Sequence, residues 1–165
     1  MSSAHWHLIL THLPIVGVPA GMALLVWGMW KKSEDLRCAA LVAFILCGAL
    51  AFFAKQTGDG AEEQIENVPG FSKSIVHEHE EMADKAFLLT AVLAVASLGV
   101  LVAGRSRTLP APTYPVLLML ALGSAGLLVY TGALGGEIRH TEIRGESFSP
   151  GQPATNPASE SDEKD

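Results

Sequence analysis

Six histidines and a group of carboxylates are the side chains of this sequence with the chemistry to bind a metal ion or haem. The densest group runs from His77 to Glu81, where every residue is ionisable. The other histidines lie near the two ends of the apolar part of the chain: His5, His7, His12 and His140. Because imidazole and carboxylate groups are common ligands of transition metals, a fold that gathers these segments would create a binding site.

Four apolar runs are the elements that would have to gather them. Of the 165 residues, 49% are hydrophobic and only 17% are charged, which is more apolar than an ordinary soluble domain. Four runs contain no Asp, Glu, Lys or Arg: residues 8–30, 38–54, 86–103 and 113–136. Each is long enough to cross a membrane, for which roughly 17 apolar residues are the lower limit. The sequence therefore predicts an all-α four-transmembrane-helix bundle, with helices at about residues 8–30, 36–56, 74–103 and 113–140.

Two further segments complete the predicted domain organisation. Between the second and third helices, Asp59 and Glu62 form a capping-box pattern, which predicts a short interfacial helix over about residues 60–68. From residue 146 onward the composition shifts to Ser, Pro, Gly, Asn and acids, which cannot bury enough apolar surface to fold. Residues 1–145 are thus predicted to form one integral membrane domain, and residues 146–165 a disordered tail.

Basic residues mark one side of the predicted bundle. The two short connections carry Lys31, Lys32, Arg37, Arg105 and Arg107, whereas the segment before the first helix has no Lys or Arg. By the positive-inside rule, these connections face the cytoplasm and both termini lie outside the membrane. All six histidines then fall at the outer end. A net charge of −6 without a basic stripe argues against a nucleic-acid partner. The four apolar runs make the lipid bilayer the predicted partner.

Helical geometry separates the two histidines of the central run. His77 and His79 are two residues apart, about 200° around a helix with 3.6 residues per turn, so only one of them can face the bundle. His79 shares its face with Ala86 and other small or apolar residues, whereas His77 shares its face with Glu81 and Asp84. We therefore expect His79 inside the bundle and His77 in water.

Three histidines from three helices are predicted to converge at a similar depth. His12 lies about one turn inside the first apolar run, and His140 extends the small-residue face of Gly132 on the last helix. His79 joins them from the third helix, and His7, nearer the surface, is the fourth candidate. Imidazole within or beside hydrocarbon is costly and tends to mark function.

Two chemistries could use these imidazoles. A b-type haem would take two of the four as axial ligands, with an arginine near its propionates, whereas a transition-metal ion such as Zn, Cu or Fe would combine histidines with carboxylates. The candidates for haem are His7, His12, His79, His140 and Arg139, and those for an ion are His12, His79, His140, Glu62, Glu63 and Glu80. Small residues behind the histidines favour haem and the density of acids favours an ion, so both alternatives stay open.

A cofactor-free structural membrane subunit is the third interpretation. The sequence has no Ser-His-Asp or Cys-His arrangement and no phosphate-binding loop, so any catalysis would depend on a bound haem or metal. Cys38 and Cys47 are about 13.5 Å apart along one predicted helix, too far to pair with each other, and are predicted to be packing residues. Gly17 and Gly21 form a G-x-x-x-G motif for close helix approach, and such faces are candidates for a homodimer contact.

Several of these segments resemble a known family. Residues 7–15, HLILTHLPI, resemble the H-x-x-x-x-H-F-P-I opening of the DUF2231 family of small four-helix bacterial membrane proteins, with Leu13 in place of phenylalanine. Residues 135–140, GGEIRH, are similar to the end of the family's fourth helix, and His79 falls where its third helix carries a histidine. The family has no assigned reaction, but the Rieske-type or cytochrome domains joined to some members imply electron transfer. The leading hypothesis is a membrane redox module that holds a b-type haem for a partner on the outer side.

Overall fold

Five α-helices make up the computed structural model, which describes residues 2–66, 68, 70–104 and 110–140. They are α1 (Ser3–Lys31), α2 (Glu34–Gln56), α3 (Gly58–Ile65), α4 (Lys73–Ala103) and α5 (Thr113–Arg139). No strand occurs in these described ranges, and α1, α2, α4 and α5 are each long and apolar enough to cross a membrane. The predicted all-α fold with four such helices is confirmed.

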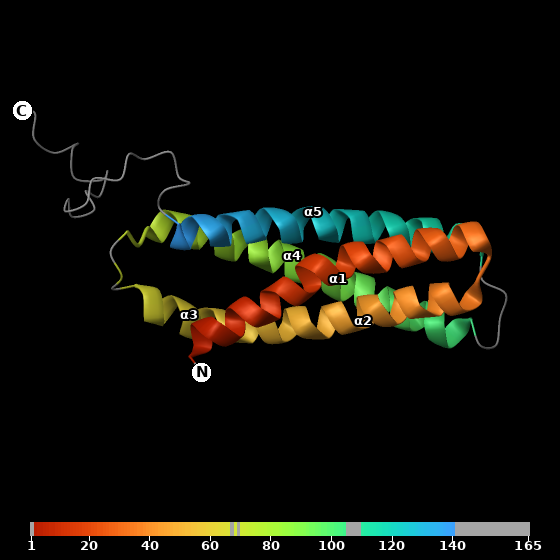
Figure 1. Ribbon diagram of the computed structural model, residues 1–165, viewed down its shortest axis with the longest axis horizontal. Coiled ribbons are helices and arrows are strands. Elements are labelled where there is room, and N and C mark those ends of the chain that lie inside the picture. Colours follow the sequence, from red (N-terminus) through yellow and green to blue (C-terminus); the bar gives the residue numbers. More distant parts are fainter. Residues whose placement is uncertain (1, 67, 69, 105–109, 141–165) are drawn as a thin grey trace, which may run out of the picture.

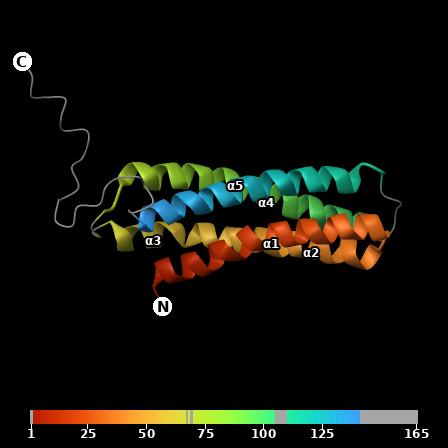
Figure 2. The ribbon, with the colours of Figure 1, turned by 45° about the horizontal axis from the view of Figure 1, so that its top comes forward.

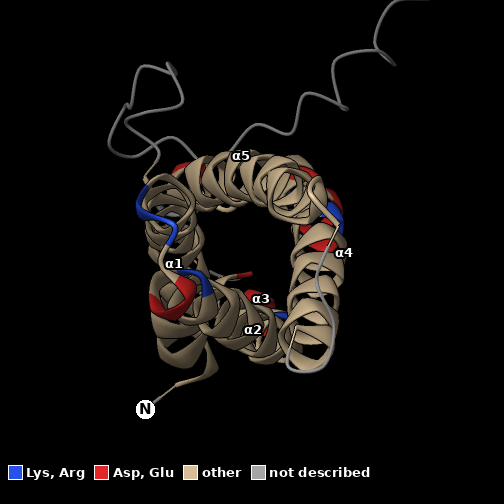
Figure 3. Cartoon of the chain, turned by 90° about the vertical axis from the view of Figure 1, so that its right-hand side faces the viewer, with Lys and Arg blue, Asp and Glu red and all other residues tan. Residues whose placement is uncertain are grey.

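The four long helices lie side by side in one elongated bundle (Figures 1 and 2). Seen from one end they follow the order α1, α2, α4, α5 around a square, so each helix packs against two neighbours (Figure 3). The short helix α3 packs against α1 near the N-terminus (Figure 1). We call this end of the bundle the site end, because it holds α3, the first turns of α1 and α4 and the last turn of α5.

The opposite end is closed by the turn between α1 and α2. Lys32 adopts a left-handed conformation with φ of 54°, and its N–H group bonds to carbonyl groups of the last turn of α1. Arg37 donates from Nε to the Gly28 carbonyl at 3.3 Å, and its guanidinium carbon lies 4.9 Å from the centre of the Tyr114 ring. Arg37 of α2 thus contacts both α1 and α5, the first and last helices of the chain.

Helix α1 is longer than the sequence predicts. It begins at Ser3, and the predicted start is residue 8. The Ser2 side chain caps it by accepting a hydrogen bond from the His5 N–H group at 3.3 Å. His7 therefore lies on a regular helix, and its direction is fixed by the helix rotation.

Helix α3 differs from the prediction in its start and end. It covers Gly58–Ile65, and its N-cap is Thr57, whose side chain makes no capping hydrogen bond. The predicted capping box at Asp59 is wrong, because Thr57 keeps a right-handed helical conformation and α3 follows almost directly from α2. The position of α3 relative to a membrane surface stays a prediction. The predicted disordered tail, residues 146–165, lies outside the described residues.

Apolar side chains fill the interior of the bundle and also cover much of its outside. Leu25, Phe44 and Leu93 are completely buried in the core. On the outer faces, however, large apolar residues are exposed, including Val95 at 71% and Met119 at 67%. Helices that are apolar all round are typical of membrane spans, because lipid rather than water then covers the outer faces.

Glycines allow α1 and α2 to approach closely. A Cβ atom added at Gly17 would lie 2.6 Å from Cys47 Sγ, and one added at Gly21 would lie 2.7 Å from Phe44 Cε1. The close approach predicted from this G-x-x-x-G motif is therefore confirmed, with α2 of the same chain as the partner helix. Cys47 is buried at this contact as predicted, whereas Cys38 is exposed.

Two glycines that differ in their surroundings test this packing. A Cβ atom added at Gly48 would overlap Ala94 of α4, whereas one added at Gly99 would meet no atom within 4 Å. We expect Gly48→Ala to destabilise the bundle by about 1–3 kcal/mol through overpacking, and the matched Gly99→Ala to be neutral or slightly stabilising. Unfolding in mixed detergent micelles measures both. Equal effects of the two substitutions would contradict the α2–α4 contact.

Candidate functional site

His7 and His79 are the two imidazoles that the fold brings together. Their ring centres are 6.4 Å apart and their ring planes meet at 72°. His7 lies on α1 and His79 on α4, and both side chains are half-buried. These two helices stand at opposite corners of the square, so the rings meet across the interior of the bundle.

Rotation about each helix explains why these histidines face inward. The buried residues of α1 form one stripe, and His7 lies on it because it precedes the buried Pro14 by seven residues, or two helical turns. On α4, His79 likewise precedes the buried Ala86 by seven residues. His77 is exposed, so the predicted split between an inward His79 and an outward His77 is confirmed.

Backbone carbonyl groups hold both imidazoles in place. His7 Nδ1 lies 2.9 Å from the Ala54 carbonyl oxygen and 3.3 Å from Thr57 Oγ1, and His79 Nδ1 lies 3.0 Å from the Thr131 carbonyl oxygen. A carbonyl oxygen only accepts hydrogen bonds, so each Nδ1 carries a hydrogen. In the neutral form of both rings, the lone pair that can bind a metal is therefore on Nε2.

The two imidazoles could contribute nitrogens to one bound centre. A metal-bound imidazole has its nitrogen about 2.0 Å from the ion, and the ring centres of His7 and His79 are 6.4 Å apart. With Nδ1 bonded to a carbonyl, each imidazole also has the outer hydrogen bond that metal-ligating histidines usually make. His7 and His79 are therefore the two histidines that the structure offers as candidate ligands.

Contacts with both neighbouring helices fix the start of α4. Next to His79, Glu78 accepts a hydrogen bond from the Tyr130 hydroxyl of α5 at 2.9 Å. Six residues after Glu78, Asp84 forms an ion pair with Lys55 of α2. The segment that carries His79 is thus tied to α5 on one side and to α2 on the other.

The structure places His12 and His140 differently from the prediction. His12 is exposed, and its Nδ1 bonds to the Leu8 carbonyl of the same helix at 2.6 Å. The prediction selects His12 by its depth in the apolar run, but its position about 140° from His7 around α1 directs it outward. Helix α5 ends at Arg139, so the exposed His140 is its C-cap and does not continue the helical face of Gly132. The Arg139 side chain lies outside the described part of the chain.

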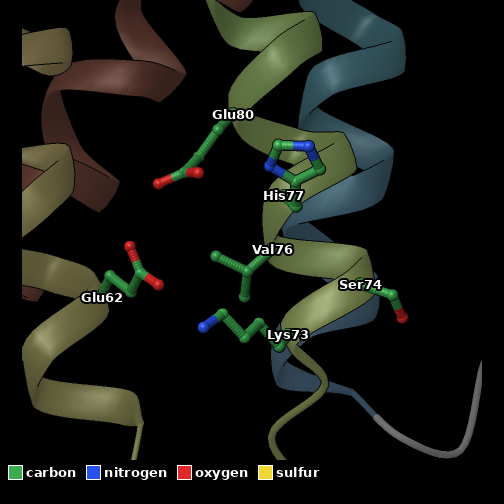
Figure 4. A pocket seen from close by; sticks show the side chains of 6 residues that line it. All are labelled: Glu62, Lys73, Ser74, Val76, His77 and Glu80. Carbon is green, nitrogen blue, oxygen red and sulfur yellow. The ribbon is translucent and has the colours of Figure 1, made fainter. Parts of the chain in front are cut away.

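Two of the predicted carboxylate ligands line a pocket together with His77, which is not one of the paired histidines. Glu62 of α3 and Glu80 of α4 extend towards each other in a pocket of about 330 Å³, which Lys73 also lines (Figure 4). The two carboxyl groups are close enough for Glu80 to raise the pKa of Glu62. The third predicted acid, Glu63, is exposed. Among the described residues, no group of three or more His, Cys, Asp or Glu side chains could hold a metal ion.

The contact with Glu80 changes the acidity of Glu62. Partial burial, the hydrogen bond from the neighbouring carboxyl and its negative charge together raise the pKa of Glu62 above the ordinary 4.5, against the opposing effect of Lys73. Protonation of Glu62 would allow a hydrogen bond between the two carboxyl groups, because two carboxylates are both acceptors. We therefore expect the contact between α3 and α4 to strengthen as the pH falls.

No family model, curated protein or solved structure matches this chain. The resemblance to the DUF2231 family therefore stays a prediction. The function has to be argued from the site itself.

The Glu62–Glu80 link predicts a pH-dependent stability. Because the pKa of Glu62 is raised, the folded chain binds more protons than the unfolded chain. The resulting contribution to the free energy of unfolding is fully present below the ordinary carboxyl pKa and is lost as the pH rises through the raised pKa. In Glu62→Gln the amide can donate to Glu80 at every pH, so we expect the unfolding midpoint to change less with pH than in the wild type. The measurement is the unfolding midpoint at several pH values between about pH 4 and about pH 8. The exposed Glu63→Gln is the control, and a wild-type slope in Glu62→Gln would contradict the shared proton.

Proposed function

We propose that this protein is a membrane redox module in which His7 and His79 are the axial ligands of a b-type haem. The observation that carries the proposal is the geometry of the pair, with ring centres 6.4 Å apart and both Nδ1 atoms bonded to carbonyl oxygens. The two Nε2 atoms are then the ligands that the chain offers.

The number of ligands favours haem over a bare ion. A structural zinc ion usually takes about four protein ligands, whereas a porphyrin supplies about four ligands to its iron and leaves two axial positions to the protein. Two paired imidazoles, without a third suitable side chain in the described ranges, match the second case. Glu62 and Glu80 face each other in a pocket of their own and do not complete a set of three.

The residues around the pair would position the cofactor and tune it. Bound haem would supply one-electron transfer, at a potential that depends on the axial ligands and their hydrogen bonds. The carbonyl groups of Ala54 and Thr131 select the tautomer, fix the ring rotation and make each Nε2 more basic. Gly135 allows the backbone of α5 to pack close to His79, since a Cβ atom there would lie 3.2 Å from His79 Cε1.

We place this site near the outer surface of a bacterial inner membrane, with both termini outside. The exposed apolar faces of the long helices support a lipid environment. Lys31 and Lys32 lie at the end opposite to the histidines, and the positive-inside rule favours a cytoplasmic position for that basic end. An electron-transfer partner on the outer side follows from this position, and so does a role like that implied by the DUF2231 resemblance. A homodimer would need a face other than Gly17 and Gly21, which α2 covers.

An absorption spectrum of purified protein tests the proposal. We expect a Soret band that shifts on reduction, and we expect His7→Ala and His79→Ala each to weaken haem binding by at least about tenfold. The exposed His5→Ala and His77→Ala are matched controls and should bind haem as the wild type does. His12→Ala should have no effect on haem binding if His7 and His79 are the ligands. It should weaken haem binding if His12 is a ligand, as the sequence predicts.

Three results would contradict the haem proposal. A colourless protein that holds stoichiometric metal, lost in His79→Ala, would indicate a non-haem metal site. A protein that binds neither haem nor metal would indicate a structural subunit. Haem binding that depends on His12 and not on His7 would move the site to the other face of α1.

A further inference from the structure

Two serines in the core of the bundle have no hydrogen-bond partner. Ser97 of α4 and Ser124 of α5 are both 0% exposed, and neither Oγ atom bonds to any group in the described part of the chain. In soluble proteins and in membranes alike, a buried polar group without a partner is costly, and nearly all such groups are paired with protein or with ordered water. These two hydroxyl groups therefore need an explanation.

A neighbouring hydroxyl shows what the ordinary arrangement looks like. Thr90 on α4 is also fully buried, and its Oγ1 donates to the Ala86 carbonyl one turn earlier at 2.7 Å. Ser97 lies on the same face of α4, seven residues further along, but does not make the equivalent bond. Close packing alone explains a small side chain at an interface between membrane helices, but it does not explain a hydroxyl group that is left unbonded.

The register of α4 and α5 places these hydroxyls at successive depths. The hydrogen bond from His79 to the Thr131 carbonyl sets the common starting level, and the buried Thr131 Oγ1 also has no partner among the described residues. At 1.5 Å per residue, Ser124 lies about 10 Å below this level, Thr90 about 16 Å and Ser97 about 27 Å. Together they extend over most of a hydrocarbon core, which is about 30 Å thick.

We propose that Ser97, Ser124 and Thr131 bind internal water molecules that form, with Thr90, a proton path through the bundle to the His7–His79 pair. The water sites stand independently of the haem, and only the outer end of the path rests on the proposed function. Through this path, protons from the far end of the bundle would reach the imidazoles.

The surroundings favour water over other ligands. The core residues beside the serines, such as Leu93, Leu117 and Ala121, are apolar and fully or almost fully buried. They offer no charge to hold an ion and no polar rim to recognise an organic molecule. Water is small and neutral, and it can both donate to and accept from a serine hydroxyl.

Proton flux in liposomes tests the path. The full chain is reconstituted with a trapped pH-sensitive dye, and a potassium diffusion potential drives protons inward. We expect wild-type flux at least about tenfold above that of protein-free liposomes, and flux within about twofold of that background for the double variant Ser97→Ala/Ser124→Ala. The control is Ser72→Ala/Ser74→Ala, which removes two hydroxyls close to the polar pocket and should leave the flux unchanged.

A second measurement addresses the water sites directly. In detergent micelles, magnetisation transfer from water should reach the amide protons of Ser97 and Ser124 but not that of Ala121, which is buried between them in the same core. Transfer that is absent at both serines would overturn the water sites. Wild-type flux equal to background, or a double variant that conducts like the wild type, would overturn the path. The Soret band tests haem binding separately. Failure of the water sites or of the proton path can therefore be told apart from failure of the proposed function.

Discussion

An imidazole at the edge of an apolar interior needs a hydrogen-bond acceptor that water does not supply, and this requirement shapes the site end of the bundle. Most helix carbonyls are already used within their own helix. The Ala54 carbonyl belongs to the last turn of α2 and accepts from His7 as well as from the N–H and hydroxyl groups of Thr57, and the Thr131 carbonyl is reached where Gly135 lets the ring come close. The end of α2 and the glycines of α5 therefore decide where two histidines can be held.

The sequence was sufficient to predict the four long helices and the direction of His79. Uncharged runs longer than the width of a membrane core leave little choice of secondary structure, because backbone groups in lipid must bond within a helix. His79 could be separated from His77 because one face of that segment carries small apolar residues and the other carries acids. Where the two faces of a helix differ in polarity, its rotation can be predicted.

The pairing of His7 with His79 could not be predicted in the same way. Helix α1 is apolar around its whole circumference, so its sequence does not show which face meets the core. The difference in depth between His7 and His12 and their separation of about 140° around the axis do not decide which of them faces inward. The signal that was available is the spacing of seven residues between His7 and Pro14 on the stripe that includes Gly21. The acceptors are backbone carbonyls, which every residue has, so no residue type marks them.

The short helix α3 touches both helices that carry the paired histidines. Its Gln64 side chain accepts from the Ala4 N–H group of α1 at 3.4 Å, and its Glu62 faces Glu80 of α4 in one pocket. Helix α3 thus lies against the first turns of both α1 and α4. Insertions or deletions in α3 would therefore move the two imidazoles relative to each other while leaving both histidines in place.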